Sequence, residues 1–219
     1  MFTGLIQALG RMYPVGRNQL RIHCPQAPIL ADLALGDSIA VDGVCLTVEQ
    51  QVPQGFLATA SPETLDRSTL GQQAEGSWVN LEASLRVGSK IGGHFVTGHV
   101  DGWGYLDTAA ETGNAWEISF SVPNPKLARY LVPQGSIAVN GISLTVADCG
   151  DRGNWFRVAV IPVTYRETTL QYLRPGQAVN LEGDILGKYV ERFLHRDASA
   201  AIPQGVAIDL DFLADHGYL

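Results

Sequence analysis

The chain has 219 residues, of which 46% are hydrophobic and 17% are charged, and its formal net charge is −7. This composition is typical of a globular protein with a hydrophobic core, and it excludes a disordered or collagen-like chain. The acidic balance argues against a nucleic-acid-binding protein, because such a protein needs a basic face for the phosphates. The 24 glycines and 11 prolines indicate many turns, and therefore many short strands.

The cysteines and the first residues indicate a cellular compartment. Cys24, Cys45 and Cys149 are odd in number and far apart, so we expect no disulfide framework and a reducing, cytoplasmic location. The opening Met-Phe-Thr-Gly-Leu-Ile has no basic leader before an apolar run, so it does not predict a signal peptide. No apolar stretch approaches the roughly 18 residues that span a membrane. We therefore expect neither a membrane partner nor a nucleic-acid partner.

The chain contains an internal duplication. Residues 39–48, Ile-Ala-Val-Asp-Gly-Val-Cys-Leu-Thr-Val, return at 137–146 as Ile-Ala-Val-Asn-Gly-Ile-Ser-Leu-Thr-Val, with seven of ten positions identical. Val-Asn-Leu-Glu at 79–82 returns unchanged at 179–182. Further repeated blocks are Thr3-Gly4 with Gly10, Pro62 with Thr64, and their counterparts Thr97-Gly98 with Gly104 and Pro162 with Thr164. Blocks in the same order at similar spacing predict two copies of one fold, with a boundary near residue 93.

Each copy of the ten-residue phrase predicts a β-hairpin. Its Asp-Gly or Asn-Gly pair lies between apolar runs and suits a type I′ turn, which needs positive φ at both central residues. Alternation after the turn places Cys45 and Thr47 on one face, away from the apolar residues, and places Ser143 and Thr145 in the same way. The pattern alone leaves two interpretations open, a pair of equivalent polar sites or two ordinary hairpins.

The remaining patterns predict strands, short helices and one longer helix. Period-two alternation indicates strands at 19–24, 55–60, 116–122 and 155–160. Short helices are expected at 28–35, after Ser61, at 125–132 and at 164–170. About six strands per copy, each with one apolar face, predict a small closed barrel. From residue 185 the apolar residues follow a helical stripe, which we interpret as an oligomer contact, with packing onto its own barrel as the alternative.

The candidate chemical residues are few. His94 and His99 are five apart, so on one regular strand they face opposite sides and would not share a metal. The glycines before His94 are not followed by Lys and Ser or Thr, so they do not form a phosphate-binding loop. Cys45 and Ser143 have no activating neighbour in the local sequence. The residues by themselves indicate two similar sites for two similar ligands, or for one pseudo-symmetric ligand.

Several motifs together resemble one family. The opening Met-Phe-Thr-Gly-Leu-Ile, the two Gly-Val-Cys-Leu-Thr-Val and Gly-Ile-Ser-Leu-Thr-Val phrases, and residues 91–99 resemble riboflavin synthase of the α-chain type, over about residues 1–195. The resemblance implies an all-β protein of two tandem six-stranded Greek-key barrels. It predicts lumazine-binding barrels at 1–93 and 94–184, a trimerisation helix at 185–196 and a C-terminal tail at 197–219.

The resemblance also implies a reaction. Two molecules of 6,7-dimethyl-8-ribityllumazine dismutate by transfer of a four-carbon unit, giving riboflavin and 5-amino-6-(D-ribitylamino)uracil, without a cofactor or a metal. It implies a cytoplasmic homotrimer with each active site between barrels of different subunits, and it makes lumazine synthase a candidate partner. Two identical substrates would suit two related barrels.

Family roles fall on matching positions of this chain. The donor pocket would contain Ser143, Thr145, Ile161, Thr164 and Asp184, and the acceptor pocket Cys45, Thr47 and Thr64. Phe2, Thr3 and Gly4 would border the site. His99 would transfer protons, and it would act as a catalytic residue together with Ser143 and Cys45.

The chain departs from the family pattern at two positions, and two other classes of protein are alternatives. The family pattern leads us to expect an acid at Asn140 and a Lys at Gln134, so we expect altered pocket electrostatics but an intact turn. A non-catalytic lumazine- or flavin-binding antenna protein is the alternative on the same fold. A flavin-reductase-like barrel would need a nicotinamide-binding partner domain, and Gly102-Trp-Gly104 lacks the third glycine of that fingerprint.

Overall fold

The computed structural model describes residues 1–25, 27–199, 214 and 217. Its contacts divide the chain into two units, Met1–Ile185 and Leu186–Leu219, and each unit is described by itself. Most of the predicted tail at 197–219 lies outside the described residues.

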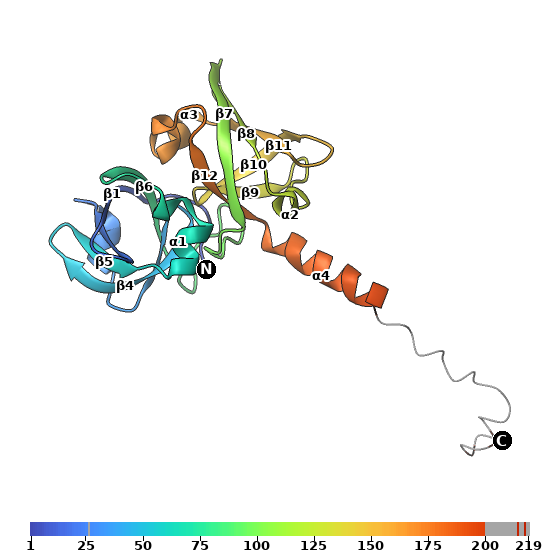
Figure 1. The fold of residues 1–219 in the computed structure, drawn as a ribbon, viewed down its shortest axis with the longest axis horizontal. Coiled ribbons are helices and arrows are strands. Elements are labelled where there is room, and N and C mark those ends of the chain that lie inside the picture. Colours follow the sequence, from blue (N-terminus) through green and yellow to red (C-terminus); the bar gives the residue numbers. More distant parts are fainter. Residues whose placement is uncertain (26, 200–213, 215–216, 218–219) are drawn as a thin grey trace. The chain divides into compact units, whose positions relative to one another are not determined.

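The first barrel contains six antiparallel strands (Figure 1). They are β1 (Ala8–Pro14), β2 (Gln19–His23), β3 (Ser38–Val41), β4 (Val44–Val52), β5 (Gly55–Thr59) and β6 (Ser77–Ala83). The sheet closes in the order β1-β2-β5-β4-β3-β6. Three short helices lie between the strands: η1 (Pro28–Asp32), α1 (Pro62–Arg67) and η2 (Thr69–Gly71).

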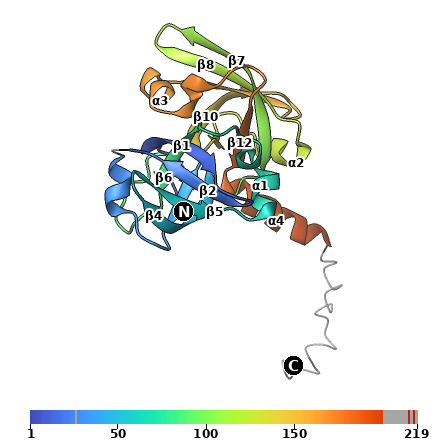
Figure 2. The same ribbon diagram turned by 60° about the vertical axis from the view of Figure 1, so that its left-hand side comes forward.

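The second barrel repeats this topology (Figure 2). Its strands are β7 (Gly102–Thr112), β8 (Ala115–Ser121), β9 (Ser136–Val139), β10 (Ile142–Cys149), β11 (Trp155–Val160) and β12 (Ala178–Gly183). Its helices are α2 (Pro125–Ala128), α3 (Pro162–Arg166) and η3 (Thr169–Tyr172). The closed order β10-β11-β8-β7-β12-β9 is that of the first barrel, with each strand replaced by its counterpart. The duplication and the paired six-stranded barrels are therefore confirmed.

The two predicted hairpin turns have the expected backbone. Asp42 and Gly43 have φ of 46° and 76°, and Asn140 and Gly141 have 46° and 79°, so both central residues are left-handed. Asn, Asp and Gly tolerate this region best, which explains their positions in the repeated phrase. Gln134, the other departure, is exposed and also has positive φ, of 66°.

The predicted helix at 164–170 is wrong in its bounds. The chain instead forms α3 from Pro162 and then a separate 3-10 helix from Thr169. Proline suits the first helical turn, where its missing N–H has no acceptor to lose, so the helix begins at Pro162. The helices predicted at 28–35 and 125–132 are shorter, ending at Asp32 and Ala128.

Each barrel has its own apolar core, and a third cluster lies between them. Strand alternation sends Leu46, Val48 and their counterparts into the barrel interiors, where they are buried. The third cluster contains Phe2, Ala40, Val96 and Ala138, with the half-buried Cys45 against it.

The repeated Val-Asn-Leu-Glu places apolar residues on one face of its strand and polar residues on the other. Val79 and Leu81 fill the first barrel, whereas the buried Asn80 points out of the barrel to the second one. Its Nδ2 donates to Asn140 O at 2.9 Å and to Thr169 Oγ1 at 2.8 Å, and its Oδ1 accepts from Thr169 N at 2.8 Å.

Asn180 makes the reciprocal bonds to the first barrel. Its Nδ2 donates to Asp42 O at 2.9 Å, and its Oδ1 accepts from Thr69 N at 2.7 Å. Each repeated asparagine therefore forms hydrogen bonds with both the hairpin turn and the 3-10 helix of the opposite barrel. Because buried amides are costly when unpaired, these bonds bring the two barrels together in one register.

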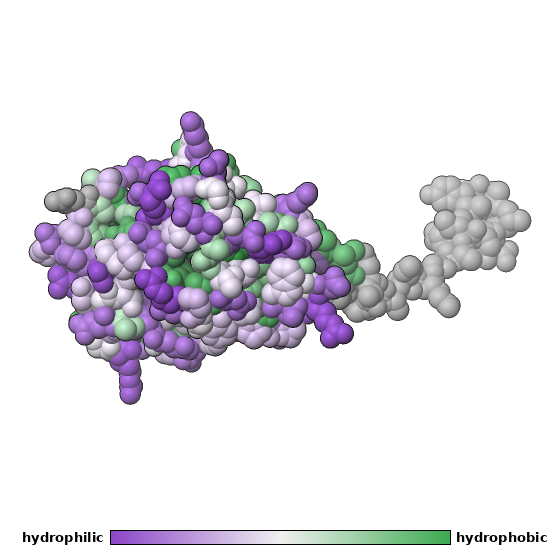
Figure 3. All heavy atoms as spheres, turned by 90° about the horizontal axis from the view of Figure 1, so that it is seen from above, coloured by the Kyte–Doolittle hydropathy of each residue, from purple (hydrophilic) through white to green (hydrophobic). Residues whose placement is uncertain are grey.

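The last helix, α4 (Ile185–Ser199), carries an uncovered apolar stripe. Leu186, Tyr189, Val190, Phe193 and Leu194 are 57–69% exposed. Apolar side chains of α4 are visible on the face seen in Figure 3. No helix in the described part of the chain has the length and apolar character needed to cross a bilayer.

Candidate functional site

The candidate site is built around two short segments that run side by side. Phe2 and Val96 form an isolated antiparallel bridge, with Phe2 N to Val96 O at 2.7 Å and Val96 N to Phe2 O at 3.1 Å. Both side chains are fully buried in the cluster between the barrels. The bridge therefore places the repeated Thr-Gly pairs, Thr3-Gly4 and Thr97-Gly98, at one junction.

A buried carboxylate binds each Thr-Gly pair. Glu82 Oε1 accepts from Thr3 N and Thr3 Oγ1, both at 2.7 Å, and Glu82 Oε2 accepts from Gly4 N at 2.9 Å. Burial raises the pKa of the Glu82 carboxyl above its ordinary value, although these hydrogen bonds oppose the rise.

Glu182 binds the second pair in the same way. Its Oε1 accepts from Thr97 N and Thr97 Oγ1 at 2.7 Å, and its Oε2 accepts from Gly98 N at 3.0 Å. The two repeated blocks, Thr-Gly and Val-Asn-Leu-Glu, are thus the two halves of one repeated contact.

The same glycines reach across to the opposite barrel. Gly4 O accepts from Ser143 N at 2.8 Å, and Gly98 O accepts from Cys45 N at 2.9 Å. Both glycines have positive φ, of 75° and 81°. A Cβ on Gly4 would lie 2.6 Å from Ser143 Cβ, and a Cβ on Gly98 would lie 2.6 Å from Cys45 Cβ. Only glycine satisfies both the turn and this close approach.

The structure brings a histidine to Ser143, and that histidine is His94. Ser143 Oγ lies 2.7 Å from His94 Nδ1, and His94 N donates to Thr3 O at 3.2 Å. The His94 side chain is buried, and among the residues that the structure describes its Nε2 finds no hydrogen-bond partner. Burial lowers the pKa of His94, although the charge of nearby Asp184 opposes the shift. A neutral imidazole at this position suits a partner for the Ser143 hydroxyl.

His99 lies elsewhere. It is exposed, and its Nδ1 is 3.2 Å from Thr97 Oγ1. Within this chain it makes no contact with Ser143 that the structure records. Its role in proton transfer therefore stays a prediction.

The polar face of each hairpin also contains a serine, Ser38 or Ser136, which is not among the predicted site residues. Strand register pairs Ser38 with Thr47 and Ser136 with Thr145. Thr47 and Thr145 are exposed, and both serines are half-buried. The signal was present, because Ser38 and Ser136 extend the repeated phrase by one residue at its start.

The other predicted site residues lie at equivalent places in the two barrels. Thr64 is in α1, where Ser61 Oγ accepts from its N–H at 3.1 Å. Thr164 is in α3, and Ile161, which precedes that helix, is 58% exposed. Asp184 is half-buried at the end of β12. The charge of Asp184 acts on the pKa of His94, which is in contact with Ser143. The substrate-binding roles of Asp184, Thr64, Thr164 and Ile161 stay predictions.

No set of three His, Cys, Asp or Glu side chains in the described residues is arranged to hold a metal ion. Burial raises the pKa of Cys24, to about 11, so this thiol is a core residue rather than a nucleophile. The side chains of the site offer hydroxyls, a thiol, histidines and a carboxylate, which can form hydrogen bonds and transfer protons.

Comparison with known proteins agrees with this architecture. The lumazine binding domain model matches residues 3–84 and 97–184, once per barrel. Riboflavin synthase of Actinobacillus pleuropneumoniae is 40% identical over 100% of both chains, and that of Mycobacterium tuberculosis is 45% identical over 89% of this chain and 98% of its own. Riboflavin synthase of Bacillus subtilis is 37% identical over 100% of both chains.

Solved structures share the fold. LumP complexed with 6,7-dimethyl-8-(1'-D-ribityl) lumazine superimposes with a TM-score of 0.73 at 23% identity, covering 83% of this chain and 98% of that one. LumP complexed with riboflavin gives 0.75 at 23% identity, covering 84% and 99%. The chain belongs to the lumazine-binding domain family and, within it, to the riboflavin synthases.

Proposed function

We propose that the chain converts two molecules of 6,7-dimethyl-8-ribityllumazine into riboflavin and 5-amino-6-(D-ribitylamino)uracil. It is a transferase that moves a four-carbon unit from one lumazine to the other. The observation that carries this function is the similarity to riboflavin synthases over 89–100% of the chain, at 35–45% identity. The duplicated barrel suits the chemistry, because two identical substrates must be treated differently.

The donor lumazine would bind to the second barrel. Ser143 and Thr145 of β10, Ile161 just before α3, Thr164 in α3 and Asp184 just after β12 would contact it. The acceptor would bind to the first barrel, against Cys45 and Thr47 of β4 and Thr64 of α1, with Phe2, Thr3 and Gly4 at the border. Holding the two rings in stacked order would supply about 7–11 kcal/mol of the barrier lowering.

Proton transfer begins the reaction. The 7-methyl group of the lumazine is acidic because its carbanion delocalises into the ring. His99 takes that proton, a step that general base catalysis speeds by about 10²–10⁴. Ser143, or a water that it positions, adds to the other lumazine. The 2.7 Å contact with neutral His94 holds the Ser143 hydroxyl in one orientation for this addition.

The active protein in this proposal is a cytoplasmic homotrimer. The uncovered stripe on α4 supports it, because five large apolar side chains more than half exposed on one helix need a partner. A trimer places the first barrel of one subunit against the second barrel of another, which completes each site. Lumazine synthase, which would supply the substrate, is a candidate partner. Boundaries at 93 and 184 for the two barrels belong to the same proposal.

A direct assay tests the function. Purified protein is incubated with 6,7-dimethyl-8-ribityllumazine, and riboflavin is followed by its absorbance. Riboflavin formation is expected. Tight binding without product would assign the chain to the alternative class, a non-catalytic lumazine- or flavin-binding protein, whose fold LumP shares.

The variant His99→Gln tests the proton-transfer role. It is expected to lower kcat by about 10²-fold, because the general base is lost. His23→Gln is the matched control, since His23 lies on β2, away from the Thr-Gly junction. Analytical ultracentrifugation checks that the oligomer is intact. Unchanged turnover by His99→Gln would show that His99 does not carry the proton.

A further inference from the structure

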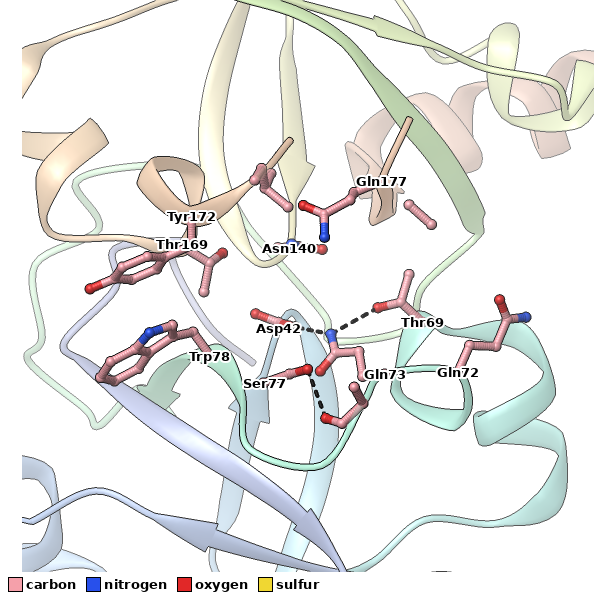
Figure 4. A pocket seen from close by; sticks show the side chains of 13 residues that line it. Asp42, Thr69, Gln72, Gln73, Ser77, Trp78, Asn140, Thr169, Tyr172 and Gln177 are labelled. Carbon is pink, nitrogen blue, oxygen red and sulfur yellow. Dashed lines mark hydrogen bonds between the residues drawn. The ribbon is translucent and has the colours of Figure 1, made fainter. Parts of the chain in front are cut away.

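A pocket lies between the barrels, apart from the residues of the candidate site (Figure 4). Its volume is about 370 Å³, within the roughly 300–1,000 Å³ of small-molecule sites. Asp42 and Asn140, from the two hairpin turns, line it together with residues of both barrels. None of the residues assigned to the lumazine site lines this pocket.

The second barrel presents two oriented amide donors to the pocket. Asn140 Oδ1 accepts from Asn180 N at 2.7 Å, so its Nδ2 is the free end, and within the described residues that atom has no partner. Gln177 Oε1 accepts from Arg174 N at 2.6 Å, which leaves its Nε2 pointing toward the middle of the pocket (Figure 4). Both N–H₂ groups are fixed before any ligand arrives.

The first barrel presents oxygens that accept. Ser77 Oγ gives its proton to Ala74 O at 2.7 Å, so its lone pairs remain available. Thr69 Oγ1 receives only a long bond, 3.3 Å, from Gln73 Nε2. Donors on one wall therefore face acceptors on the other.

The surroundings exclude two other ligand classes. No Lys or Arg is among the residues that line the pocket, whereas the carboxyl of Asp42 is, so the charge of the lining does not favour an anion. Trp78 is already stacked on Tyr172, with centroids 5.1 Å apart, and Arg11 lies 3.9 Å from its ring centroid. A flat heterocycle therefore finds no open indole face.

We propose that this pocket binds a short, neutral polyol. Each hydroxyl of a polyol both donates and accepts, so a polyol can receive the bonds of Asn140 and Gln177 and donate to Ser77 and Thr69. The chain of such a molecule needs no aromatic face, and its hydroxyls suit a lining whose one carboxyl, Asp42, accepts hydrogen bonds. This binding does not depend on the proposed catalytic activity.

Titration with ribitol tests the proposal on the full-length protein. The side-chain amide signals of Asn140 and Gln177 are expected to shift saturably in ¹⁵N NMR spectra. Pentane-1,5-diol, which has the same chain without the inner hydroxyls, is expected to leave them unmoved. Gln177→Ala should weaken ribitol binding about threefold to tenfold, as the loss of one neutral hydrogen bond predicts. Asn140→Asp, which keeps the acceptor for Asn180 N but removes the free donor, should weaken it similarly.

Gln171→Ala is the matched control and should bind like the parent protein, because Gln171 lies on the same 3-10 helix as Tyr172 but outside the pocket. The proposal fails if ribitol causes no saturable shift, or if Gln177→Ala and Asn140→Asp both bind it like the parent protein. It also fails if saturating riboflavin displaces ribitol, since ribitol would then occupy the lumazine site. A protein without synthase activity that still binds ribitol in this way would contradict the proposed function alone.

Discussion

The two barrels share a backbone frame but place different chemistry on it. In the second barrel Ser143 Oγ lies 2.7 Å from the buried His94 Nδ1, whereas in the first barrel Cys45 contacts the apolar cluster around Phe2. The frames match closely, since Gly4 O and Gly98 O accept from the backbones of Ser143 and Cys45 at 2.8 and 2.9 Å. Duplication thus supplied two equivalent positions, and a few side chains give them different properties.

A second difference lies at the hairpin turns. Asp42 and Asn140 make the same contact, accepting from Asn80 N at 2.8 Å and from Asn180 N at 2.7 Å. Asp42 is ionisable and fully buried, and burial raises its pKa to about 7. The first barrel therefore carries a titrating group where the second carries a neutral amide.

The largest expected effect comes from breaking the frame that the barrels share. Glu82→Ala leaves Thr3 N, Thr3 Oγ1 and Gly4 N without their acceptor, which should lower the free energy of unfolding by about 3–5 kcal/mol. Glu182→Ala should have a similar effect. Urea denaturation measures both.

Glu82→Gln is the control for this pair. It keeps the shape and one acceptor oxygen, so it should lose only part of that stability. If Glu82→Ala were neutral while Glu182→Ala unfolded the protein, the two junctions would not be energetically equivalent.

The next largest effect is expected from Asp42→Asn, which removes the titrating carboxyl. Wild-type Asp42 binds its proton in the folded state up to about pH 7, but only to about pH 4 when unfolded. The unfolded state therefore binds fewer protons between these values, and Asp42 makes the free energy of unfolding fall as pH rises from about 4 to 7. Asp42→Asn should abolish this component and stabilise the protein by roughly 2–4 kcal/mol more at about pH 8 than at about pH 4.

The substitution should be tolerated by its surroundings. Asn suits the positive φ, and its Oδ1 can accept from Asn80 N. Gln73 now donates to Asp42 Oδ2, and its Oε1 has no partner within the described part of the chain, so turning its amide provides an acceptor for the new N–H₂. Asn140→Asp should do the reverse and steepen the loss of stability with pH. Parallel pH curves for Asp42→Asn and wild type would contradict the assignment.

The smallest expected effects come from replacing Ser143 and Cys45, the equivalent positions of the two barrels. Ser143→Ala should lower kcat/KM for riboflavin formation about tenfold, which corresponds to about 1.4 kcal/mol, because the oriented hydroxyl beside His94 is lost. Cys45→Ala should cost less, about threefold, because the thiol packs against an apolar cluster and has no histidine partner comparable to His94. Equal losses would mean that the barrels are chemically interchangeable.

Local sequence predicted the parts of the fold that depend on neighbouring residues. The Asp-Gly and Asn-Gly turns, the alternation after them and the strand at 155–160 follow from backbone preference and side-chain period, so they appear as expected. Helix bounds were less certain, because Pro162 moves the start of α3 forward. Backbone bulges such as the one between Val48 and Gln50 left no signal in the pattern of apolar residues.

The candidate site was predicted only in part. The repeated phrase identified Cys45 and Ser143, but the sequence favoured no partner for either. Spacing suggested that His94 and His99 face opposite sides, and only the fold shows that His94 is the one at Ser143. The inter-barrel pocket was not expected at all, since its walls come from segments far apart along the chain.

The sequence by itself determined that there are two copies of one barrel, with matched hairpins and matched polar faces, because repeats and periodicity are properties of one dimension. It could not determine why Val-Asn-Leu-Glu and Thr-Gly are repeated. Only the tertiary structure shows that each glutamate binds the Thr-Gly pair 78–85 residues away, and that each asparagine reaches into the opposite barrel, up to 138 residues away. Buried polar groups must find partners wherever the fold brings them, so these pairings were decided by the packing of two barrels and not by the order of residues.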